Sequence, residues 1–472
     1  MQKRIQWKYL YRFACAALLT ILAAGLFLGA WYDFVAENNQ TGHLTGWGNL
    51  GMSVLLYIAV FVLVGRWLHA FKIGVERKAS VMASQVLTLL VTDFIELFLS
   101  LAITGQFRFL GEFLGIYAAM YLVQAVLLSA LVIPMIDLYR RIFPPLQLLE
   151  ICGTNPAPDD TTRDPLAYKV NGLPSKYHIA QRLSYTEIDT VLRAAIEGND
   201  AVLIADLPAG DKNHILKLCY DLDKRVYFVP KLSDVIVKGS EELNLFDTPL
   251  FLCRNRGISA GELAIKRTFD VVLSLLALVI LSPILLITAI AIKAEDGGPV
   301  FYRQERCTTG GRRFMILKFR SMIVDAERDG CPHPAGEHDD RITKVGRIIR
   351  ACRVDELPQL INIIRGDMSI VGPRPERVEH VAKYTEDIPE FTFRTKVKAG
   401  LTGMAQVYGR YNTTALDKLK YDLLYITSFS VLLDLQIIFE TVKILVQKES
   451  TEGFSEEQAA QMQERGDQGN TD

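Results

Sequence analysis

The first third of the chain alternates long apolar stretches with short polar loops. The apolar stretches run over 13–32, 50–68, 86–103 and 113–136. Each approaches the ~20 residues that a helix needs to cross about 30 Å of hydrocarbon. The first stretch is too long and uninterrupted for a signal peptide and lacks a good cleavage site. The pattern therefore predicts a four-helix transmembrane domain over residues 1–145.

Basic residues are concentrated before the first stretch, between the second and the third, and after the fourth. They are Lys3, Arg4, Lys8, Arg12, Arg66, Lys72, Arg77, Lys78, Arg140 and Arg141. The loop after the first stretch has no Lys or Arg, and the loop after the third has only Arg108. Because Lys and Arg favour the cytoplasmic side, the N-terminus and everything after Arg141 are predicted to lie in the cytoplasm.

Two carboxylates, Asp93 and Glu96, fall inside the third stretch. Carboxylates within a membrane are costly and often mark proton or ion paths. Alternatively, they face the interior of the bundle and bond to neighbouring side chains, or they lie near the interface. The sequence leaves both interpretations open, with a transporter as the second class for this half of the chain.

The middle of the chain, residues 146–258, has the composition of a soluble domain. An exposed linker is predicted over 154–165. Short apolar runs at 201–205 and 226–229 flank a helical stretch near 214–222. Strand, helix and strand at this spacing predict a βαβ unit with parallel strands. Because no Gly-x-Gly-x-x-Gly loop follows a strand, a dinucleotide site is unsupported, and we expect a degenerate Rossmann-like α/β domain.

A fifth apolar run, 269–292, differs from the first four. Ser282 and Pro283 interrupt its middle, and a proline there removes a backbone hydrogen bond and kinks the helix. Basic residues flank both ends: Lys266, Arg267 and Lys293. Neither end therefore resembles the outer side of a crossing. We expect a re-entrant helix that turns at Ser282 and Pro283 within the inner leaflet, with an ordinary fifth span as the alternative.

Downstream, apolar-polar strands are predicted over 299–304 and 314–319 around a Gly-Gly pair, which is typical of a hairpin. Lys318 and Arg320 are two residues apart, so on an extended strand they point to the same face. Two cations on one face, next to a re-entrant membrane helix, could bind an anion. A solvated basic face would have the same local sequence.

Residues 354–367 place two adjacent carboxylates before a helix. Pro358 suits the first turn of this helix and Gly366 suits its end. Asp355 and Glu356 then lie at the positive end of the helix dipole, where carboxylates stay ionised. A shared cation relieves their repulsion, and Mg2+ commonly bridges carboxylate and phosphate oxygens. An ionised Asp is also a nucleophile towards phosphorus, although acidic residues that merely cap a helix are common.

Two glycine-containing turns follow this helix. Prolines on both sides of Arg374 stiffen its loop, and a held guanidinium can bind a phosphate through two hydrogen bonds. Lys398 and Thr402 lie in a Lys-Ala-Gly-Leu-Thr-Gly turn that offers a cation and a hydroxyl. An amphipathic helix over 432–446 suits the surface of the inner leaflet, and the polar residues 451–472 are predicted to be disordered.

Composition excludes several classes. The 472 residues carry a formal net charge of −1, so nothing points to nucleic acid as a partner. The seven cysteines are scattered and odd in number, which argues against a disulfide framework. Cys331, His333 and His338 share one loop, but no fourth clear ligand completes a zinc site.

Four motifs in this order resemble a known family. They are Lys318-Phe319-Arg320-Ser321-Met322, Asp355-Glu356-Leu357-Pro358-Gln359-Leu360, Gly372-Pro373-Arg374-Pro375 and Gly400-Leu401-Thr402-Gly403, behind Lys266, Arg267 and Asp270. Over about 262–447 the chain resembles the bacterial polyprenyl-phosphate phosphoglycosyl transferases of the monotopic type. Its front and middle parts resemble the long members, which initiate exopolysaccharide, capsule or O-antigen (lipopolysaccharide) synthesis.

The resemblance implies that a mainly helical catalytic domain, 259–450, moves a hexose-1-phosphate from a UDP-sugar to undecaprenyl phosphate. Asp355 would attack the β-phosphate and release UMP, and the polyprenyl phosphate would then take the phosphosugar from the enzyme. Asp355 and Glu356 would hold Mg2+. The implied phosphate- or substrate-binding residues are Lys318, Arg320, Gln359, Arg374, Lys398 and Thr402. The enzyme would work at the cytoplasmic face of the bacterial inner membrane, against membrane lipid, with a homodimer as an option.

Two other classes remain in view. A transporter or channel with a cytosolic regulatory domain would need polar residues in several spans, and only the third offers carboxylates. A nucleotide-binding membrane scaffold would leave Asp355, Glu356 and Arg374 without a purpose. The sequence does not identify the sugar, although the resemblance favours UDP-galactose or UDP-glucose.

Overall fold

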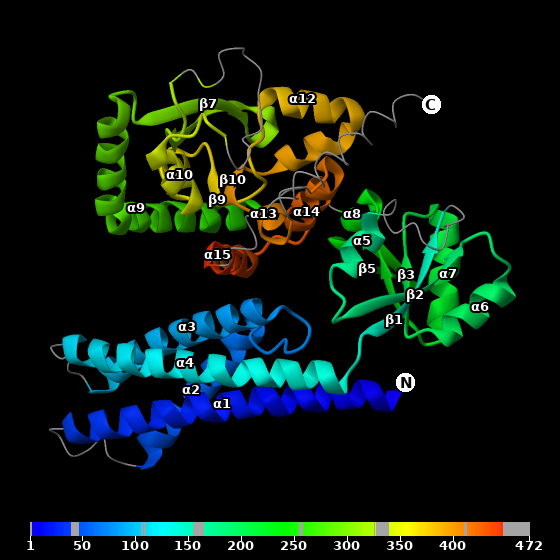
Figure 1. Ribbon diagram of the computed structural model, residues 1–472, viewed down its shortest axis with the longest axis horizontal. Helices are drawn as coiled ribbons and strands as arrows, with labels where there is room; N and C mark the ends of the chain where they lie inside the picture. The colour runs from blue at the N-terminus through cyan, green and yellow to red at the C-terminus, as the bar shows by residue number, and fades with distance from the viewer. Residues whose placement is uncertain are drawn as a thin grey trace. The chain divides into compact units, whose positions relative to one another are not determined.

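The computed structural model describes residues 2–38, 47–104, 107, 110–153, 165–253, 258–324, 326, 339–409 and 413–446. The predicted disordered tail and the loop with Cys331, His333 and His338 lie outside these residues. The chain divides into two compact units, Met1–Pro230 and Lys231–Asp472 (Figure 1). Its described part is mainly helical and includes five helices long and apolar enough to cross a membrane. The protein is accordingly membrane-associated.

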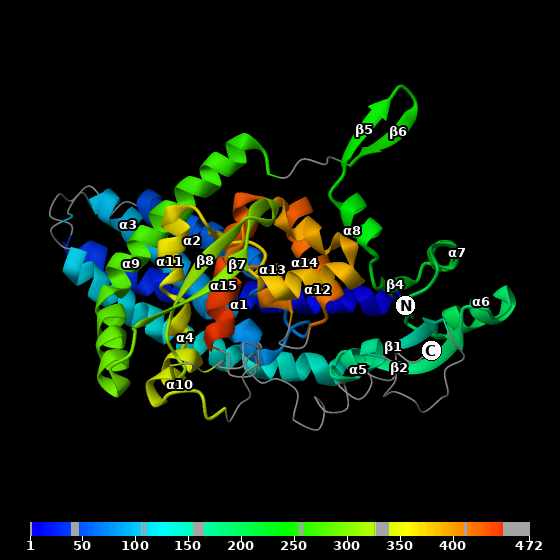
Figure 2. The same cartoon turned by 90° about the horizontal axis from the view of Figure 1, so that it is seen from above.

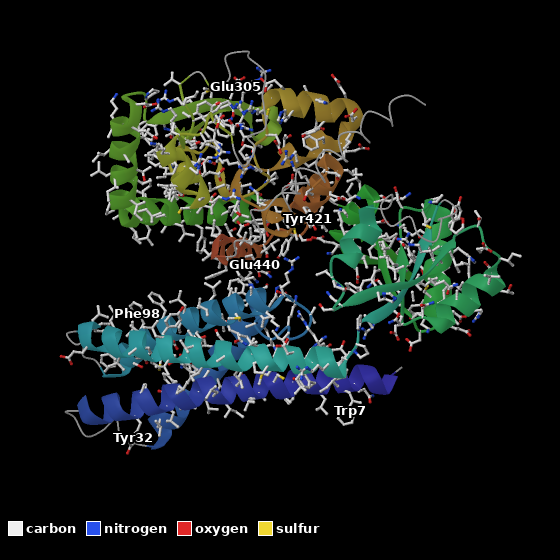
Figure 3. All side chains as sticks on the ribbon, in the orientation of Figure 1. Trp7, Tyr32, Phe98, Glu305, Tyr421 and Glu440 are labelled. Atoms are coloured by element: carbon white, nitrogen blue, oxygen red, sulfur yellow. The ribbon has the colours of Figure 1, made fainter. Side chains whose placement is uncertain are left out.

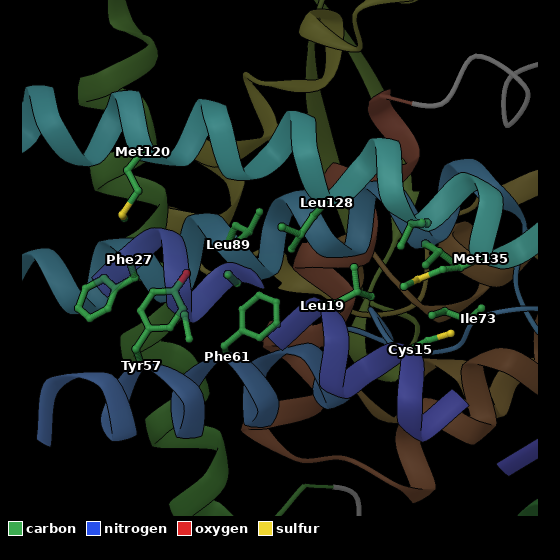
Figure 4. Packing of buried hydrophobic residues seen from close by; sticks show 14 of the residues in the cluster. Cys15, Leu19, Phe27, Tyr57, Phe61, Ile73, Leu89, Met120, Leu128 and Met135 are labelled. Carbon is green, nitrogen blue, oxygen red and sulfur yellow. The ribbon is translucent and has the colours of Figure 1, made fainter. Parts of the chain in front are cut away.

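The first unit begins with four long helices. They are α1 (Gln2–Asn38), α2 (Trp47–Trp67), α3 (Lys78–Thr104) and α4 (Leu110–Ile142). Each packs against two of the others and shares one buried apolar cluster, in which the rings of Phe27 and Tyr57 stack at 4.4 Å (Figure 4). Side chains such as Trp7 and Phe98 point away from the helices and are 63% and 49% exposed (Figure 3). Apolar side chains therefore occupy both the interior and the outer surface of these helices.

A parallel sheet with strand order β2-β1-β3-β4 follows these helices. Its elements are β1 (Leu146–Cys152), α5 (Pro165–Asn171), β2 (Tyr177–Ser184), α6 (Asp189–Gly198), β3 (Ala201–Ile204), α7 (Ala209–Asp221) and β4 (Arg225–Phe228). The predicted βαβ unit is confirmed, because β3 and β4 pair in parallel on either side of α7 in the chain. Every residue of β3 is buried, which explains its uninterrupted apolar run.

The second unit is built on α9 (Ala260–Asp296). Ser259 and Glu262 form a capping box at its start, and Gly297 ends it in the left-handed conformation. Figure 1 shows α9 as two arms joined by a sharp bend, and Pro283 lies within the helix. The predicted interruption is thus a bend in a continuous helix, as a proline produces. Only 11% of the residues in the most apolar stretch of α9 are buried in the protein.

The second unit also contains shorter helices and strands that precede or follow α9 in the chain. They are α8 (Leu232–Lys238), β5 (Glu241–Leu245), β6 (Thr248–Leu252), β7 (Phe301–Cys307), η2 (Thr309–Gly311), β8 (Arg313–Phe319), α10 (Lys344–Ala351), η3 (Val354–Glu356), α11 (Gln359–Arg365), β9 (Ser369–Val371), α12 (Val378–Asp387), η4 (Pro389–Lys396), β10 (Gly400–Thr402), α13 (Met404–Tyr408), α14 (Ala415–Thr427) and α15 (Val431–Val446). The predicted hairpin is confirmed as β7 and β8. Figure 2 shows β5 and β6 as a second hairpin that extends away from α8.

Gly366 ends α11 as the sequence predicts, with φ +92°. Gly366→Ala is expected to lower the free energy of unfolding by about 1–2 kcal/mol, because a Cβ disfavours this backbone conformation. Gly261→Ala, in α9 with open space around its Cβ position, should leave stability unchanged or raise it slightly. Thermal unfolding of the detergent-solubilised protein compares the two variants. Equal effects would contradict the conformational argument.

Candidate active site

Asp355 and Glu356 lie in η3, a single 3-10 turn between α10 and α11. The sequence predicted them at the N-terminal end of the following helix, with Pro358 in its first turn. The structure instead makes Pro358 the N-cap of α11 and separates the two carboxylates from it. Backbone bonds of the i to i+3 type join Val354 to Leu357 and Leu357 to Leu360, so the chain winds tightly here.

Two cations from distant parts of the chain bind Glu356. Lys318 Nζ and Arg374 Nη2 each lie 2.8 Å from the same atom, Glu356 Oε1. Burial acts to raise the pKa of Glu356, but the charges of Arg374 and Lys318 outweigh it and hold this pKa well below its usual range. Glu356 is therefore ionised and fixed, and its second oxygen, Oε2, makes no hydrogen bond to the described residues.

Asp355 contrasts with its neighbour. Its carboxylate makes no hydrogen bond or ion pair with any residue that the structure describes. Burial raises the pKa of Asp355, and the charge of Glu356 raises it further, while Lys318, Arg350 and Arg353 act in the opposite direction. A half-buried carboxylate without partners is free to act as a nucleophile or a metal ligand.

Lys318 reaches this turn from β8, where it lies opposite Tyr302 in the hairpin. Its side chain is 20% exposed, and burial lowers its pKa although Glu356 partly restores it. The ammonium group is thus largely removed from water and directed at the carboxylate. A cation in such surroundings interacts with an anion more strongly than it would at the surface.

Arg374 belongs to the Gly-Pro-Arg-Pro loop, whose backbone is held by a hydrogen bond from Arg394. Arg394 on η4 donates from Nη2 to the carbonyl oxygen of Arg374 at 2.9 Å. The same guanidinium donates from Nε to Asp422 Oδ2 on α14 at 3.0 Å. Arg394 and Asp422 are buried, with side chains 5% and 1% exposed. Sequence reasoning missed both residues; the available signal was Asp422 on a helix face shared with the apolar Leu419 and Leu423.

The other predicted residues have different surroundings. Arg320 pairs with Asp296 at the end of α9, and its Nε and Nη1 atoms are buried without a hydrogen bond. Gln359 is buried at the start of α11. The Thr402 hydroxyl lies 2.6 Å from Thr441 Oγ1 on α15.

Lys398 lies near the C-terminal end of α11. Its ammonium and the Arg267 guanidinium both flank Gly366, at 3.8 and 3.5 Å from the position of an ideal Cβ. Burial, followed by the charge of Arg267, lowers the pKa of Lys398. The structure therefore joins Lys318 and Arg374 directly to Glu356, whereas Arg320, Lys398 and Thr402 make no hydrogen bond to it.

The two carboxylates fit a magnesium ion that is shared with a substrate. Among the described residues, Asp355 has no partner, and Glu356 Oε2 is left free because both cations bind Oε1. Among the described residues, no group of three or more His, Cys, Asp or Glu side chains is arranged to hold a metal. Mg2+ usually takes one or two carboxylates and completes its shell with water and substrate phosphates.

Comparisons with known proteins agree with this region of the chain. The family model described as bacterial sugar transferase matches residues 261–448. A UDP-glucose:undecaprenyl-phosphate glucose-1-phosphate transferase of Klebsiella pneumoniae is 41% identical over 244 residues, which are 49% of this chain and 50% of the relative. A protein of the same description from Caulobacter vibrioides is 44% identical over 187 residues, 38% of this chain and 69% of the relative.

A shorter relative is matched almost throughout. The exopolysaccharide production protein PSS of Rhizobium leguminosarum is 39% identical over 189 residues, which are 38% of this chain and 94% of that protein. By contrast, the chain covers 50%, 59% and 52% of three longer relatives. The match to the family model lies within the second unit, where Asp355, Glu356 and Arg374 lie.

Proposed function

Because the chain belongs to the bacterial sugar transferase family, we propose that it transfers a hexose-1-phosphate from a UDP-sugar to undecaprenyl phosphate. The products would be UMP and an undecaprenyl-diphosphate sugar. This reaction would be the first membrane step of exopolysaccharide, capsule or O-antigen synthesis. Similar relatives described as UDP-glucose or UDP-N-acetylgalactosamine transferases support the substrate class.

The observation that carries the proposal is the contrast between the two carboxylates of η3. Glu356 is fixed by Lys318 and Arg374, whereas Asp355 beside it is only partly exposed and has no partner in the part of the chain that the structure describes. A purely structural pair of acidic residues would be bonded to the helix that follows, and Asp355 is not. This arrangement instead suits one anchoring carboxylate and one reactive carboxylate.

In the first step, an Asp355 carboxylate oxygen forms a bond to the β-phosphorus of the UDP-sugar. The bond between that phosphorus and the bridging oxygen breaks, and UMP leaves with the bridging oxygen. In the second step, a phosphate oxygen of undecaprenyl phosphate attacks the same phosphorus and returns the carboxylate to Asp355. Both displacements occur at one phosphorus and need no redox partner.

The charged neighbours have separate tasks in this scheme. Lys318 and Arg374 orient Glu356 and offer their remaining donors to the phosphate oxygens of the substrate; the Arg374 side chain is still 40% exposed. Asp355 and Glu356 Oε2 would hold Mg2+, which when bound neutralises charge on the phosphates. Arg320, Gln359, Lys398 and Thr402 stay proposed as substrate-binding residues.

The re-entrant course of α9 is also part of the proposal, with the second unit on the cytoplasmic face of the inner membrane. Near the start of α9, Lys266 Nζ donates to Asp434 Oδ2 at 2.6 Å. At its end, Asp296 pairs with Arg320, and Glu295 accepts the backbone N–H of Lys344 at 2.7 Å. Contacts of both ends with the same unit support a helix that returns to its side of entry. Ser282 and Pro283 would then turn the chain within the leaflet.

The architecture of the first unit is a further part of the proposal. Helices α1–α4 would be a transmembrane bundle, and the parallel sheet would be a degenerate Rossmann-like domain used for structure or regulation. The exposed apolar side chains of α1–α4 and α9 would contact membrane lipid. A homodimer is an additional expectation, and the oligomeric state of the purified protein in lipid nanodiscs would test it.

Release of nucleoside monophosphate tests the function directly. Detergent-solubilised protein is incubated with Mg2+, undecaprenyl phosphate and one nucleotide sugar at a time. UMP is expected with one UDP-sugar, and its release should require both the metal and the enzyme. The absence of release with every sugar, from folded protein, would reject the proposal.

The acid limb of the pH profile should report Asp355, which must be ionised to attack. Burial and Glu356 raise its pKa, so activity should fall at a higher pH than an ordinary aspartate would give. Arg350 acts to lower this pKa; Arg350→Gln should therefore move the acid limb to higher pH. Arg347→Gln, an exposed residue on the same helix, is the matched control. Profiles of kcat/KM at limiting Mg2+, where the metal-free enzyme sets the acid limb, would check the shift, and identical limbs would contradict it.

A further inference from the structure

A polar network lies inside helices α1–α4, in the unit that does not carry the catalytic residues. Asp93 and Glu96 are three residues apart on α3, so they share one face of the helix, and they are only 4% and 1% exposed. The Tyr57 hydroxyl on α2 donates to Asp93 Oδ1 at 3.2 Å. Gln124 Nε2 on α4 donates to the Tyr57 oxygen at 3.0 Å and to the Ala23 carbonyl on α1 at 3.1 Å.

A second set of bonds surrounds the backbone of Glu96. Trp31 Nε1 on α1 donates to Ser100 Oγ at 3.2 Å, and Ser100 bonds to the Tyr117 hydroxyl on α4 at 2.8 Å. Tyr117 also reaches the Glu96 carbonyl oxygen at 3.3 Å. The Glu96 side chain makes no hydrogen bond or ion pair with the residues that the structure describes. All four helices thus contribute to one buried polar region.

The network has more acceptors than donors. Asp93 Oδ2, Glu96 Oε1 and Gln124 Oε1 are buried oxygen atoms without a hydrogen-bond partner among the described residues. An ionised carboxylate and an amide oxygen can only accept, so none of these atoms can satisfy another. Leaving such groups unpaired in an apolar interior is costly.

The network also lacks a positive charge. No Lys or Arg among the described side chains pairs with Asp93 or Glu96, and the titratable groups that face them are the phenols of Tyr57, Tyr117 and Tyr121. An ionised carboxylate without a counter-charge is far more costly to bury in a membrane than a neutral acid. The missing donors and the missing positive charge are two deficits of the same site.

We propose that Asp93 and Glu96 form a proton-binding site within this helical bundle and carry a proton each at neutral pH. One proton per carboxyl removes the charge and turns an acceptor atom into a donor, so it corrects both deficits. Neither residue has a role in the proposed transfer reaction, which uses the other unit. Ionisable groups in the core of membrane helices are typical of proton-exchange sites, where an amide or apolar side chain would serve for packing alone.

A hydrophobic carbodiimide tests the protonation state in the full-length protein in lipid nanodiscs. The reagent adds a protonated carboxyl across its N=C bond; the carboxyl proton goes to nitrogen, and acyl migration gives a stable N-acylurea. Peptide mass spectrometry is expected to find this adduct at Asp93 or Glu96 at neutral pH, with severalfold slower labelling at alkaline pH. Glu112, exposed in the first turn of α4, is the internal control and should stay unmodified.

Neutral isosteres and infrared spectroscopy make the test independent of reagent access. Asp93→Asn and Glu96→Gln should fold normally and lose the adduct at the substituted position. The carbonyl stretch of protonated carboxylic acid should be present in the wild-type protein and lost in the double variant, while UMP release is unchanged. Folded wild-type protein without this band would overturn the proposal. Suppression of labelling by sodium chloride, but not by choline chloride, would also overturn it, since sodium would then be the ligand. None of these outcomes affects the assignment of Asp355.

Discussion

Asp355→Asn is expected to abolish nucleoside monophosphate release, with a loss on the order of 10³-fold or more in kcat. The amide has the same shape as the carboxylate but cannot form the acyl phosphate (a mixed anhydride) with the β-phosphorus. Because Asp355 makes no hydrogen bond or ion pair with the described residues, the substitution removes no structural contact. Turnover should therefore disappear without a change in the thermal unfolding midpoint.

Two controls sharpen this prediction. Asp387→Asn changes an exposed carboxylate at the end of α12 and should leave turnover intact. A UDP-sugar labelled in its sugar, supplied without undecaprenyl phosphate, should leave label on denatured wild-type protein and none on Asp355→Asn. If the variant kept a substantial fraction of wild-type turnover, the covalent step would be wrong. Direct transfer between the two substrates would then be the better explanation.

The local sequence pattern predicted the helices and strands whose formation depends mainly on their own residues. The apolar stretches became α1–α4, the run around Pro283 became the bent α9, and the paired strands became β7 and β8. Each of these depends on periodicity or on a residue such as proline, whose effect is confined to its own segment. Long-range pairing is different: Glu356 meets Lys318 and Arg374 across 38 and 18 residues of chain, respectively. The sequence motifs identified these residues as candidates, but the hydrogen bonds between them could be found only in the folded structure.

Arg320 illustrates a limit of strand alternation. Its spacing from Lys318 predicted that both side chains point to one face, which holds only while the strand continues. β8 ends at Phe319, so Arg320 is already outside the strand, and its guanidinium pairs with Asp296 instead. Gly298 lies so close that a Cβ there would overlap the Arg320 guanidinium. Strand alternation describes only the residues of one strand, so it could not predict that Arg320 pairs with Asp296 of α9.

The buried pair of Arg394 and Asp422 was missed for a related reason, and its removal gives the second large effect. Arg394→Met is expected to lower the free energy of unfolding by about 3–5 kcal/mol, because it leaves Asp422 buried and unpaired. Burial raises the pKa of Asp422 to about 6 even though Arg394 acts to lower it, so this carboxylate depends on Arg394 to remain ionised at neutral pH. Arg313→Gln, which removes an exposed pair with Glu305, should have little effect on thermal unfolding.

The double variant Arg394→Met with Asp422→Leu separates packing from positioning. An apolar pair of similar volume should recover most of the lost stability, as replacements of buried ion pairs commonly do. It should not recover activity, because the carbonyl oxygen of Arg374 has then lost the donor that lies 2.9 Å away. A loop that holds Arg374 less firmly should raise KM for the UDP-sugar more than it lowers kcat, if Arg374 binds substrate phosphate. Full recovery of both stability and KM would show that Arg394 only stabilises the fold.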